Sequence, residues 1–409
     1  MNTAATASPW KQPAQVWAVA FACVVAFMGI GLVDPILPAI AESLQASPVE
    51  TELLFTSYLL VTGLAMLVTS WISSRIGAKA TLLIGLALIV VFALLCALSG
   101  SVDAVIGFRA GWGLGNALFI STALATIVGA ASGGSSAAIV LYEAALGLGI
   151  AIGPLLGGLL GEQSWRGPFF GVVVLMAIAF VAVLVLVRGS TEKRVPVPFS
   201  APFTALRRPA LAVLAVAALF YNIGFFVLLA FSPFPLGFGA MGIGLTFFGW
   251  GVALAVTSVW VAPALMRRMP RTRIILLVLP LLALDLVAAG LLVESPPALV
   301  VCIVIGGLLL GVMNTVLTEA VMEATDLPRS VASSSYSAVR FLGGAMAPPI
   351  AALLWHAFNA TVPYLFAAAA VLIAALTVFL GRRVLAHIDD EPADAPAEDA
   401  AAILVGDAA

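Results

Sequence analysis

The chain is an almost continuous succession of apolar runs, separated by short turns rich in glycine, proline and serine. A transmembrane helix needs about 20 mostly apolar residues. Twelve runs of that length occur, at residues 16–41, 48–72, 80–100, 102–127, 135–161, 168–188, 210–236, 241–266, 274–293, 297–323, 330–358 and 362–382. Ser47, Pro48 and Glu50 form a capping box that marks the start of the second run. The pattern predicts an all-α integral membrane protein with twelve transmembrane helices.

Basic residues predict the orientation of these helices. With an even number of spans both termini lie on one side, and 15 lysines and arginines fall on that side against one, Arg166, on the other. Because cytoplasmic loops carry the excess of basic residues, both termini are expected in the cytoplasm. The first apolar run is too long for a signal-peptide core and has no clear cleavage site behind it, so it is interpreted as the first span.

A hydrophilic, proline-containing stretch at residues 189–209 divides the predicted helices into two halves, 16–188 and 210–382. We expect this stretch to be a cytoplasmic linker, residues 1–15 to be a cytoplasmic N-terminal segment, and residues 383–409 to be an acidic, disordered cytoplasmic tail.

The two halves resemble each other in sequence. Leu148-Gly149 and Pro154 follow Tyr142 at the spacing at which Leu342-Gly343 and Pro348 follow Tyr336. Parallel repeats of this kind are typical of transporters whose substrate site lies at the midplane between two pseudo-symmetric halves.

Composition excludes several classes of protein. Charged residues make up only 9% of the chain and apolar residues 63%, whereas a soluble domain carries roughly 25% charged residues. A net charge of −2 argues against a nucleic-acid partner. The cysteines lie inside apolar runs, and no metal-ligand spacing, nucleophile elbow or phosphate loop occurs. We therefore expect no enzyme activity, no metal and no cofactor.

Charged residues within the spans are the sharpest candidates for function, because a charge at the bilayer centre costs at least about 2.5–3.5 kcal/mol. Asp34 and Arg109 lie at matching depths in two antiparallel spans, so we expect them to face each other. Arginine stays protonated whereas aspartate can bind and release a proton, which makes the pair a candidate proton switch. A permanent structural ion pair is the alternative.

Further charges lie in the fifth, ninth, tenth and eleventh spans. Glu143 is a candidate second proton site or cation contact, and Arg340 is expected at a similar depth, paired with Glu143, Asp285 or Glu319. Aromatic and amide residues near these charges suggest a mostly apolar cavity that would bind lipophilic or amphipathic solutes, although packing or lipid contact is the better interpretation of any single aromatic side chain. The predicted lining comprises Phe27, Tyr58, Trp112, Asn116, Tyr142, Tyr221, Asn222, Phe225, Asn314, Glu319, Tyr336 and Arg340.

Glycines recur every fourth residue along the fifth span, at Gly149, Gly153, Gly157 and Gly161, with Pro154 between them. Small residues at this spacing let helix backbones approach closely in a membrane. The ridge is either a sliding contact that seals one side of the membrane from the other or a static packing surface.

Three segments resemble the major facilitator superfamily, in its twelve-span drug–proton antiporter branch. They are Gly147–Gly158, which resembles the motif that marks antiporters, Arg109–Gly115, which resembles the motif with a membrane-embedded arginine implicated in proton transfer, and Asp34–Pro38, which resembles a motif of exporters. The resemblance implies a conformational role for Gly149, Gly153, Pro154, Gly157 and Gly158.

A fourth signature departs from the family pattern. The loop after the second span carries Arg75, Gly77 and Lys79, but Ser74 stands in place of an acid and Ala78 in place of a base. In the family this loop latches the outward-facing state through charge contacts with the other half. The resemblance therefore implies altered conformational control here.

Together these features predict a proton-coupled exporter of lipophilic or amphipathic small molecules such as drugs, which works as a monomer in the bacterial cytoplasmic membrane. Its partners would be the solute, protons and the lipid bilayer. Two alternatives stay open: a transporter of one metabolite, such as a siderophore, sugar or amino-acid derivative, and a non-transporting membrane receptor on the same fold.

Overall fold

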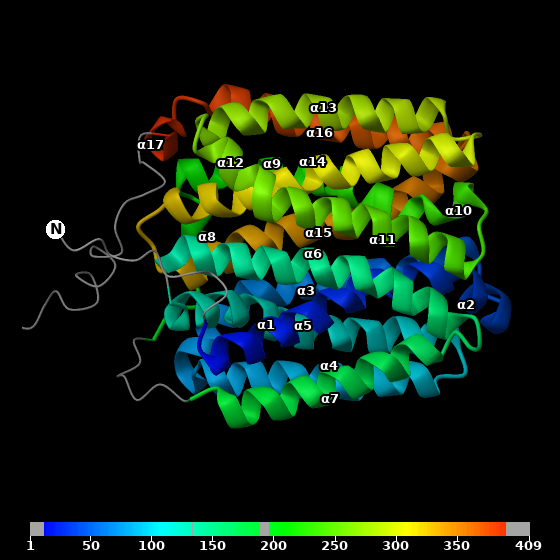
Figure 1. Ribbon diagram of the computed structural model, residues 1–409, viewed down its shortest axis with the longest axis horizontal. Helices are drawn as coiled ribbons and strands as arrows, with labels where there is room; N and C mark the ends of the chain where they lie inside the picture. The colour runs from blue at the N-terminus through cyan, green and yellow to red at the C-terminus, as the bar shows by residue number, and fades with distance from the viewer. Residues whose placement is uncertain (1–11, 133, 189–195, 390–409) are drawn as a thin grey trace, which may run out of the picture.

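The computed structural model describes residues 12–132, 134–188 and 196–389. In this part of the chain all regular structure is helical, and 12 helices are long and apolar enough to cross a membrane. The long helices run alongside one another in one bundle (Figure 1). The predicted all-α membrane fold is confirmed.

The first half contributes six long helices: α1 Ala14–Gly31, α3 Pro48–Ile76, α4 Ala78–Leu98, α5 Val102–Ala130, α6 Gly134–Gly161 and α7 Gly167–Leu186. The predicted capping box at the start of α3 is present, since Ser47 Oγ accepts a hydrogen bond from the Glu50 backbone and the Glu50 carboxylate accepts one from Ser47 N. The second half begins with α9 Pro209–Phe226, a π-helical turn η2 Val227–Phe231, and α10 Pro233–Leu236. It continues with α11 Ala240–Val256, a second π-helical turn η3 Thr257–Val261, α12 Ala262–Met266, α13 Arg271–Leu291, α14 Pro296–Glu323, α15 Arg329–Ala357 and α16 Thr361–Gly381.

The first predicted span is interrupted rather than continuous. Helix α1 ends at Gly31, the 3-10 turn η1 spans Asp34–Ile36, and a short helix α2, Leu37–Leu44, follows. Pro35 explains the interruption, because its ring disfavours the α conformation at the residue before it and removes one backbone donor. Asp34 therefore lies at a break between two helices.

One end of the bundle carries both ends of the described chain, and we call it the terminal end. It lies to the left in Figure 1, with the start of α1, the linker helix α8 (Ala201–Ala205) and the last helix α17 (Ala386–Asp389). The short helices α2 and α10 lie at the opposite end.

Part of the predicted disordered tail is ordered. Ile388 is buried, and its carbonyl oxygen accepts a hydrogen bond of 3.0 Å from Arg271 Nη1. The Asp389 carboxylate accepts a second one of 3.1 Å from the Thr272 backbone. These contacts hold α17 against the start of α13, so the prediction of disorder from residue 383 fails for residues up to 389; the rest of the tail, residues 1–11 and residues 189–195 lie outside the described chain.

The two halves meet along two helix pairs, α6 with α11 and α3 with α15. Along the first pair, a Cβ at Gly158 would lie 2.9 Å from the Ala240 carbonyl oxygen, and one at Gly244 would lie 2.7 Å from that of Pro154. Gly251 packs just as closely on Ala151. Glycine is required at such positions because any side chain would push the two backbones apart.

The glycine ridge of α6 faces a different neighbour. Gly149, Gly153 and Gly157 lie against the backbone of α1, at Val24, Met28 and Leu32 respectively. The ridge therefore packs α6 within its own half, and the Pro154 ring likewise lies against Gly31 of α1. The Pro154 carbonyl oxygen and Gly158 face the second half.

We predict that Gly251→Ala destabilises the contact between the halves. The added methyl group would overlap the Ala151 backbone, and overpacking of this kind costs about 1–3 kcal/mol. Thermal unfolding in detergent should show a lower midpoint for Gly251→Ala than for the wild type. Gly107→Ala is the matched control, because nothing lies within 4 Å of a Cβ at that helical position. Equal midpoints for the two variants would contradict close packing at Gly251.

Candidate functional site

Arg109 on α5 is fully buried within the first half. Its Nη1 donates to the Gly29 carbonyl oxygen of α1 and its Nε to the Leu54 carbonyl oxygen of α3, both at 3.4 Å. The guanidinium carbon lies 4.3 Å from the ring centroid of Tyr58 and 4.8 Å from that of Trp112. Carbonyl dipoles and aromatic faces both stabilise a desolvated cation, so this pocket can hold a permanent charge inside the membrane.

The predicted partner of Arg109 is placed only in part. The Asp34 backbone lies in η1, a few residues beyond Gly29, whose carbonyl oxygen Arg109 contacts. The Asp34 side chain lies outside the described structure, so its pairing with Arg109 stays a prediction. Asn116, two turns along α5, is also fully buried, and neither atom of its amide has a hydrogen-bond partner among the described residues.

A second polar cluster lies between the halves, centred on Glu143 of α6. Thr318 Oγ1 on α14 donates a hydrogen bond of 3.0 Å to Glu143 Oε1. The other carboxylate oxygen, Oε2, is buried and has no hydrogen-bond partner among the described residues. Arg340 on α15 lies within electrostatic reach of this carboxylate, but the structure records no ion pair between the two groups, so their predicted pairing stays a prediction. Glu143 belongs to the first half, whereas Thr318 and Arg340 belong to the second.

Polar side chains of the second half surround Arg340. Tyr221 donates a hydrogen bond of 2.6 Å to Asn314 Oδ1, and Asn222 Nδ2 donates one of 2.7 Å to the Arg340 carbonyl oxygen. The tyrosines within electrostatic reach of the Arg340 guanidinium are Tyr142, Tyr221 and Tyr336. Four helices, α6, α9, α14 and α15, thus bring the predicted polar residues of both halves together.

This cluster can change its charge by one proton. Arginine remains protonated at any working pH, whereas a carboxyl group has a charged and a neutral form. Loss or gain of a proton at Glu143 therefore decides whether Arg340 faces a counter-charge across the interface between the halves. An attraction of this kind is strong where water is excluded.

The predicted aromatic lining is packed rather than open. The rings of Phe27 and Tyr142 meet edge to face at 5.5 Å between centroids, and those of Phe225 and Trp250 do so at 5.2 Å. Tyr58 and Trp112 pack in the same way at 6.2 Å. In this structure these rings mainly fill the space between helices, as the alternative interpretation held.

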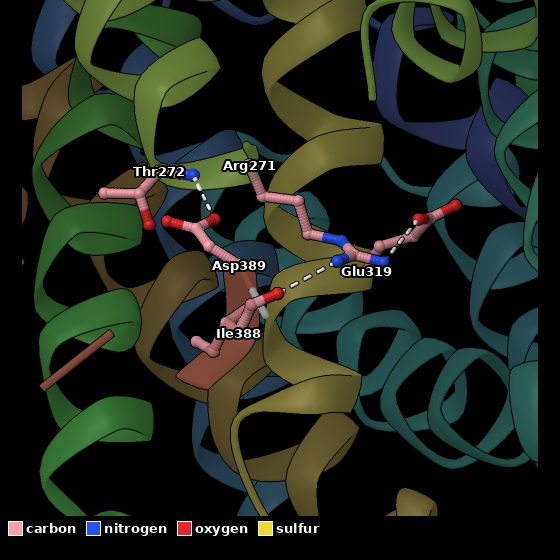
Figure 2. A network of polar contacts seen from close by, with 5 residues as sticks. All are labelled: Arg271, Thr272, Glu319, Ile388 and Asp389. Atoms are coloured by element: carbon pink, nitrogen blue, oxygen red, sulfur yellow. Dashed lines mark hydrogen bonds and ion pairs between the residues drawn. The ribbon is translucent and has the colours of Figure 1, made fainter. Parts of the chain in front are cut away.

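Glu319 lies apart from Arg340, at the terminal end of α14. Its carboxylate forms an ion pair of 3.8 Å with Arg271 of α13. Figure 2 shows Arg271 between Glu319 on one side and Ile388 of α17 on the other. Arg271 therefore ties α13 to α14 and α17.

The last turn of α3 contacts the linker between the halves. Val197 N donates a hydrogen bond of 3.0 Å to Ser74 Oγ, and Arg75 Nη1 donates one of 3.3 Å to the Val197 carbonyl oxygen. Gly77 turns the chain into α4 with a φ of 91°, which favours glycine. Lys79 Nζ donates to the Leu184 carbonyl oxygen of α7 at 2.8 Å. Ser74 thus binds backbone of the linker where the family pattern has an acid.

The structure contains a cavity of about 790 Å³ at the terminal end of the first half, bordered by α3, α4 and α5. Gly77 and Lys79 line it, whereas no member of the predicted aromatic and amide lining does. A smaller apolar groove of about 400 Å³ lies between α1, α6 and α7.

Sequence reasoning missed Thr318 and Arg271, although both carried a signal. Thr318 lies one helical turn from Asn314, so the two side chains share a face of α14. Arg271 is one of the basic residues that predict the orientation, and its place directly before the ninth span puts it at the end of a helix.

Comparison with known proteins identifies the family and the fold. The Major Facilitator Superfamily model matches residues 19–327. The chain is 52% identical over 378 residues to the multidrug efflux protein YfmO of Bacillus subtilis (strain 168), covering 92% of this chain and 96% of that one. It is 32% identical over 189 residues to the tetracenomycin C resistance and export protein of Streptomyces glaucescens, covering 45% of this chain and 35% of that one. The crystal structure of the human organic anion transporter MFSD10 (TETRAN) has a TM-score of 0.74 at 18% identity, over 89% of this chain and 99% of that one. At that identity the last likeness shows the fold alone.

We predict that Arg109→Lys lowers stability although it keeps the charge. A lysine has no planar guanidinium to lie against Tyr58 and Trp112 while reaching both carbonyls, and a desolvated cation–π contact contributes about 2 kcal/mol. Thermal unfolding in detergent measures the loss. Arg273→Lys, at an exposed position of α13, is the control and should unfold like the wild type. An Arg109→Lys variant as stable as this control would contradict the role given to the guanidinium.

Proposed function

The chain belongs to the Major Facilitator Superfamily, and we propose that it exports lipophilic or amphipathic small molecules, drugs among them, in exchange for protons. The names of two relatives support export as the direction, since one is a multidrug efflux protein and the other a resistance and export protein. The observation that carries proton coupling is the position of Glu143, a buried carboxyl in one half whose hydrogen-bond partner, Thr318, lies in the other.

The position of Glu143 suggests how one proton controls two halves. With Glu143 charged, its attraction to Arg340 and its hydrogen bond from Thr318 hold α6 to α14 and α15. Proton binding removes the charge, weakens the attraction to Arg340 and frees the halves to rearrange. A protein that passes through this cycle while solute leaves on the opposite side performs antiport by alternating access.

Asp34 and Arg109 form the second proposed proton site. The site lies where η1 interrupts the first span, and Arg109 already contacts the carbonyl of Gly29 just before that interruption. A proton on Asp34 would change how strongly α1 is held to α5. The two sites act on different helices, α1 at Arg109 and α14 with α15 at Glu143.

We place the protein in the bacterial cytoplasmic membrane, as a monomer with the terminal end toward the cytoplasm. The basic residues support this orientation, because Arg75, Lys79, Arg188, Arg267 and Arg268 gather at the terminal end. Solute would then be loaded from the cytoplasm.

We expect Glu143→Gln to abolish solute-driven proton movement. Inside-out vesicles would be energised, and proton release followed with a pH-sensitive dye as lipophilic cations, neutral antibiotics, organic anions and metal-free siderophores are added. The wild type should release protons with at least one class. Glu143→Gln, which cannot carry a proton in exchange, should fall to the rate of vesicles without the protein.

Glu162→Gln is the matched control, because Glu162 is an exposed carboxylate just beyond the end of α6. It should behave like the wild type at equal expression. Release that persists in Glu143→Gln and disappears in Asp34→Asn would move the coupling site to Asp34. No release by the wild type with any class would contradict proton-coupled export.

A further inference from the structure

Asp285 is a carboxyl group within the membrane that neither proposed proton site uses. It lies on α13, at the edge of the bundle beside α14 and α16 (Figure 1), about 9 Å from the nearer end of its helix. Its side chain is 7% exposed, and Oδ2 is buried with no hydrogen-bond partner among the described residues. Its neighbours Leu281 and Leu284 are exposed and therefore face lipid. The carboxyl group thus lies between helices at a depth where lipid, not water, surrounds the protein.

The Asp285 carboxyl group lies against Gly306 of α14. A Cβ on Gly306 would lie 3.2 Å from Asp285 Oδ2 and 2.5 Å from Leu228 Cδ1, which belongs to the π-helical turn η2. Gly306 is therefore the point at which α13, α14 and η2 meet. Because interiors are closely packed, a change in the space around the carboxyl group also changes the packing of Leu228.

No basic side chain among the described residues neutralises Asp285. Helices α9, α14 and α16 and the turn η2, which pack around α13, contain no lysine, arginine or histidine. Arg271, on α13 itself, lies about 21 Å away along the helix and pairs with Glu319. His387 of α17 is exposed, and α17 is held at the start of α13. A charged Asp285 would therefore have no counter-charge in this arrangement.

The titratable groups around Asp285 are a thiol and a phenol. Cys302, one turn from Gly306 on α14, lies within electrostatic reach of the carboxyl group, and Tyr364 of α16 lies within reach of Cys302. Both types of side chain are neutral near neutral pH. The other acids on these elements lie toward their ends: Glu294 in the turn after α13, Glu319 and Glu323 near the end of α14, and Asp389 in α17.

These surroundings favour the neutral form of the Asp285 carboxyl group. A buried carboxylate without a partner is costly in a membrane, because neither water nor an opposite charge compensates it. Proton binding removes that cost. A proton, unlike a solute, needs no cavity, because the carboxyl oxygen itself holds it. The absence of a cavity beside a buried oxygen therefore does not prevent proton binding there.

The turn beside Asp285 leads into a break that resembles the one in the first span. Ser232-Pro233 directly follows η2, and Asp34-Pro35 lies at the break after α1. The Tyr364 hydroxyl donates a hydrogen bond of 2.9 Å to Ser232 Oγ, so this break carries two hydroxyls where the first half carries an acid. π-helical turns are rare and occur frequently at functional sites. The second half thus has an acid close to its own break, supplied by α13.

We propose that Asp285 is a third proton-binding site, which holds a proton in the arrangement described here and releases it when η2 moves away from α14. Movement of Leu228 off Gly306 would open space beside the carboxyl group and let water reach it. The charged form would in turn keep that space open, so the protonation of Asp285 and the conformation of η2 are linked. Unlike the Glu143 cluster, this site lies within the second half, and the proposal does not depend on export.

Infrared spectroscopy measures this protonation directly, because the carbonyl stretch of a protonated carboxyl group is separate from the bands of carboxylates. The purified full-length protein would be studied in a maltoside detergent, which has no carbonyl group. At neutral pH the wild type should show a protonated-carboxyl band that is lost in Asp285→Asn and kept in Glu143→Gln. Asp103→Asn is the matched control, because Asp103 is exposed in the first turn of α5 and should contribute only carboxylate bands.

Isotope labelling gives a second measurement that needs no variant. In wild-type protein made with aspartate carrying ¹³C in its side-chain carboxyl group, the band should move to lower frequency, and labelled glutamate should leave it in place. Raising the pH should remove it. Three results overturn the proposal: no aspartate-derived band in the wild type, an aspartate-derived band that persists in Asp285→Asn, and a band that survives at every pH at which the protein stays folded.

Hydrogen–deuterium exchange tests the link to η2. Above the pH at which the band disappears, peptides covering Val227–Phe231 should exchange faster in the wild type than in Asp285→Asn; below that pH the two proteins should exchange alike. Peptides covering the other π-helical turn, Thr257–Val261, are the control and should exchange alike at every pH. Equal exchange of η2 in the two proteins throughout would contradict the link. Because no solute or gradient is used, each failure here leaves proton-coupled export standing.

Discussion

A charge placed inside a membrane must find its partners within the protein, and this constraint organises the structure. Arg109 contacts two backbone carbonyl oxygens and the faces of two aromatic rings, all from its own half. The partners of Glu143 lie across the boundary between the halves: Thr318 donates a hydrogen bond to its carboxylate, and Arg340 lies within electrostatic reach. The first arrangement can persist whatever the halves do, because these two carbonyls and two rings belong to the same half as Arg109. The second depends on how the halves are placed, so a change in the charge of Glu143 and a change in that placement are physically linked.

Close helix packing makes this linkage possible. Helix α6 contacts α1 through its glycine ridge and α11 through the Pro154 carbonyl oxygen and Gly158, so it is held on both sides by close backbone contacts. Contacts of this kind leave little room for gradual deformation, and packed interfaces tend instead to have discrete arrangements. Glu143 lies on the same helix. A charge on α6 can therefore act on a rigid element that both halves share.

Much of the fold follows from sequence, because lipid imposes a simple rule on length and polarity. The predicted spans coincide with the helices to within a few residues, and the exception, the break at Asp34–Ile36, follows from Pro35. The site was predictable only in part. Arg109 and Glu143 stand out because intramembrane charge is costly. Their partners do not, because the rotation of each helix decides which side chains meet; Glu319 faces Arg271 whereas its neighbour Thr318 faces Glu143. The cavity at the terminal end depends on several helices at once, so no single run of the sequence predicts it.

The central claim, that the charge of Glu143 controls the arrangement of the halves, can be measured as a distance. Spin labels at Gly129 of the first half and Arg267 of the second, both exposed at the terminal end, would report their separation by pulsed electron resonance in nanodiscs. The native cysteines are buried and would be replaced as a precaution. The account predicts that the distribution of distances changes between mildly alkaline and acidic pH, and that Glu143→Gln shows the acidic distribution at every pH. A Glu143→Gln protein that keeps the full pH-dependent change would contradict it.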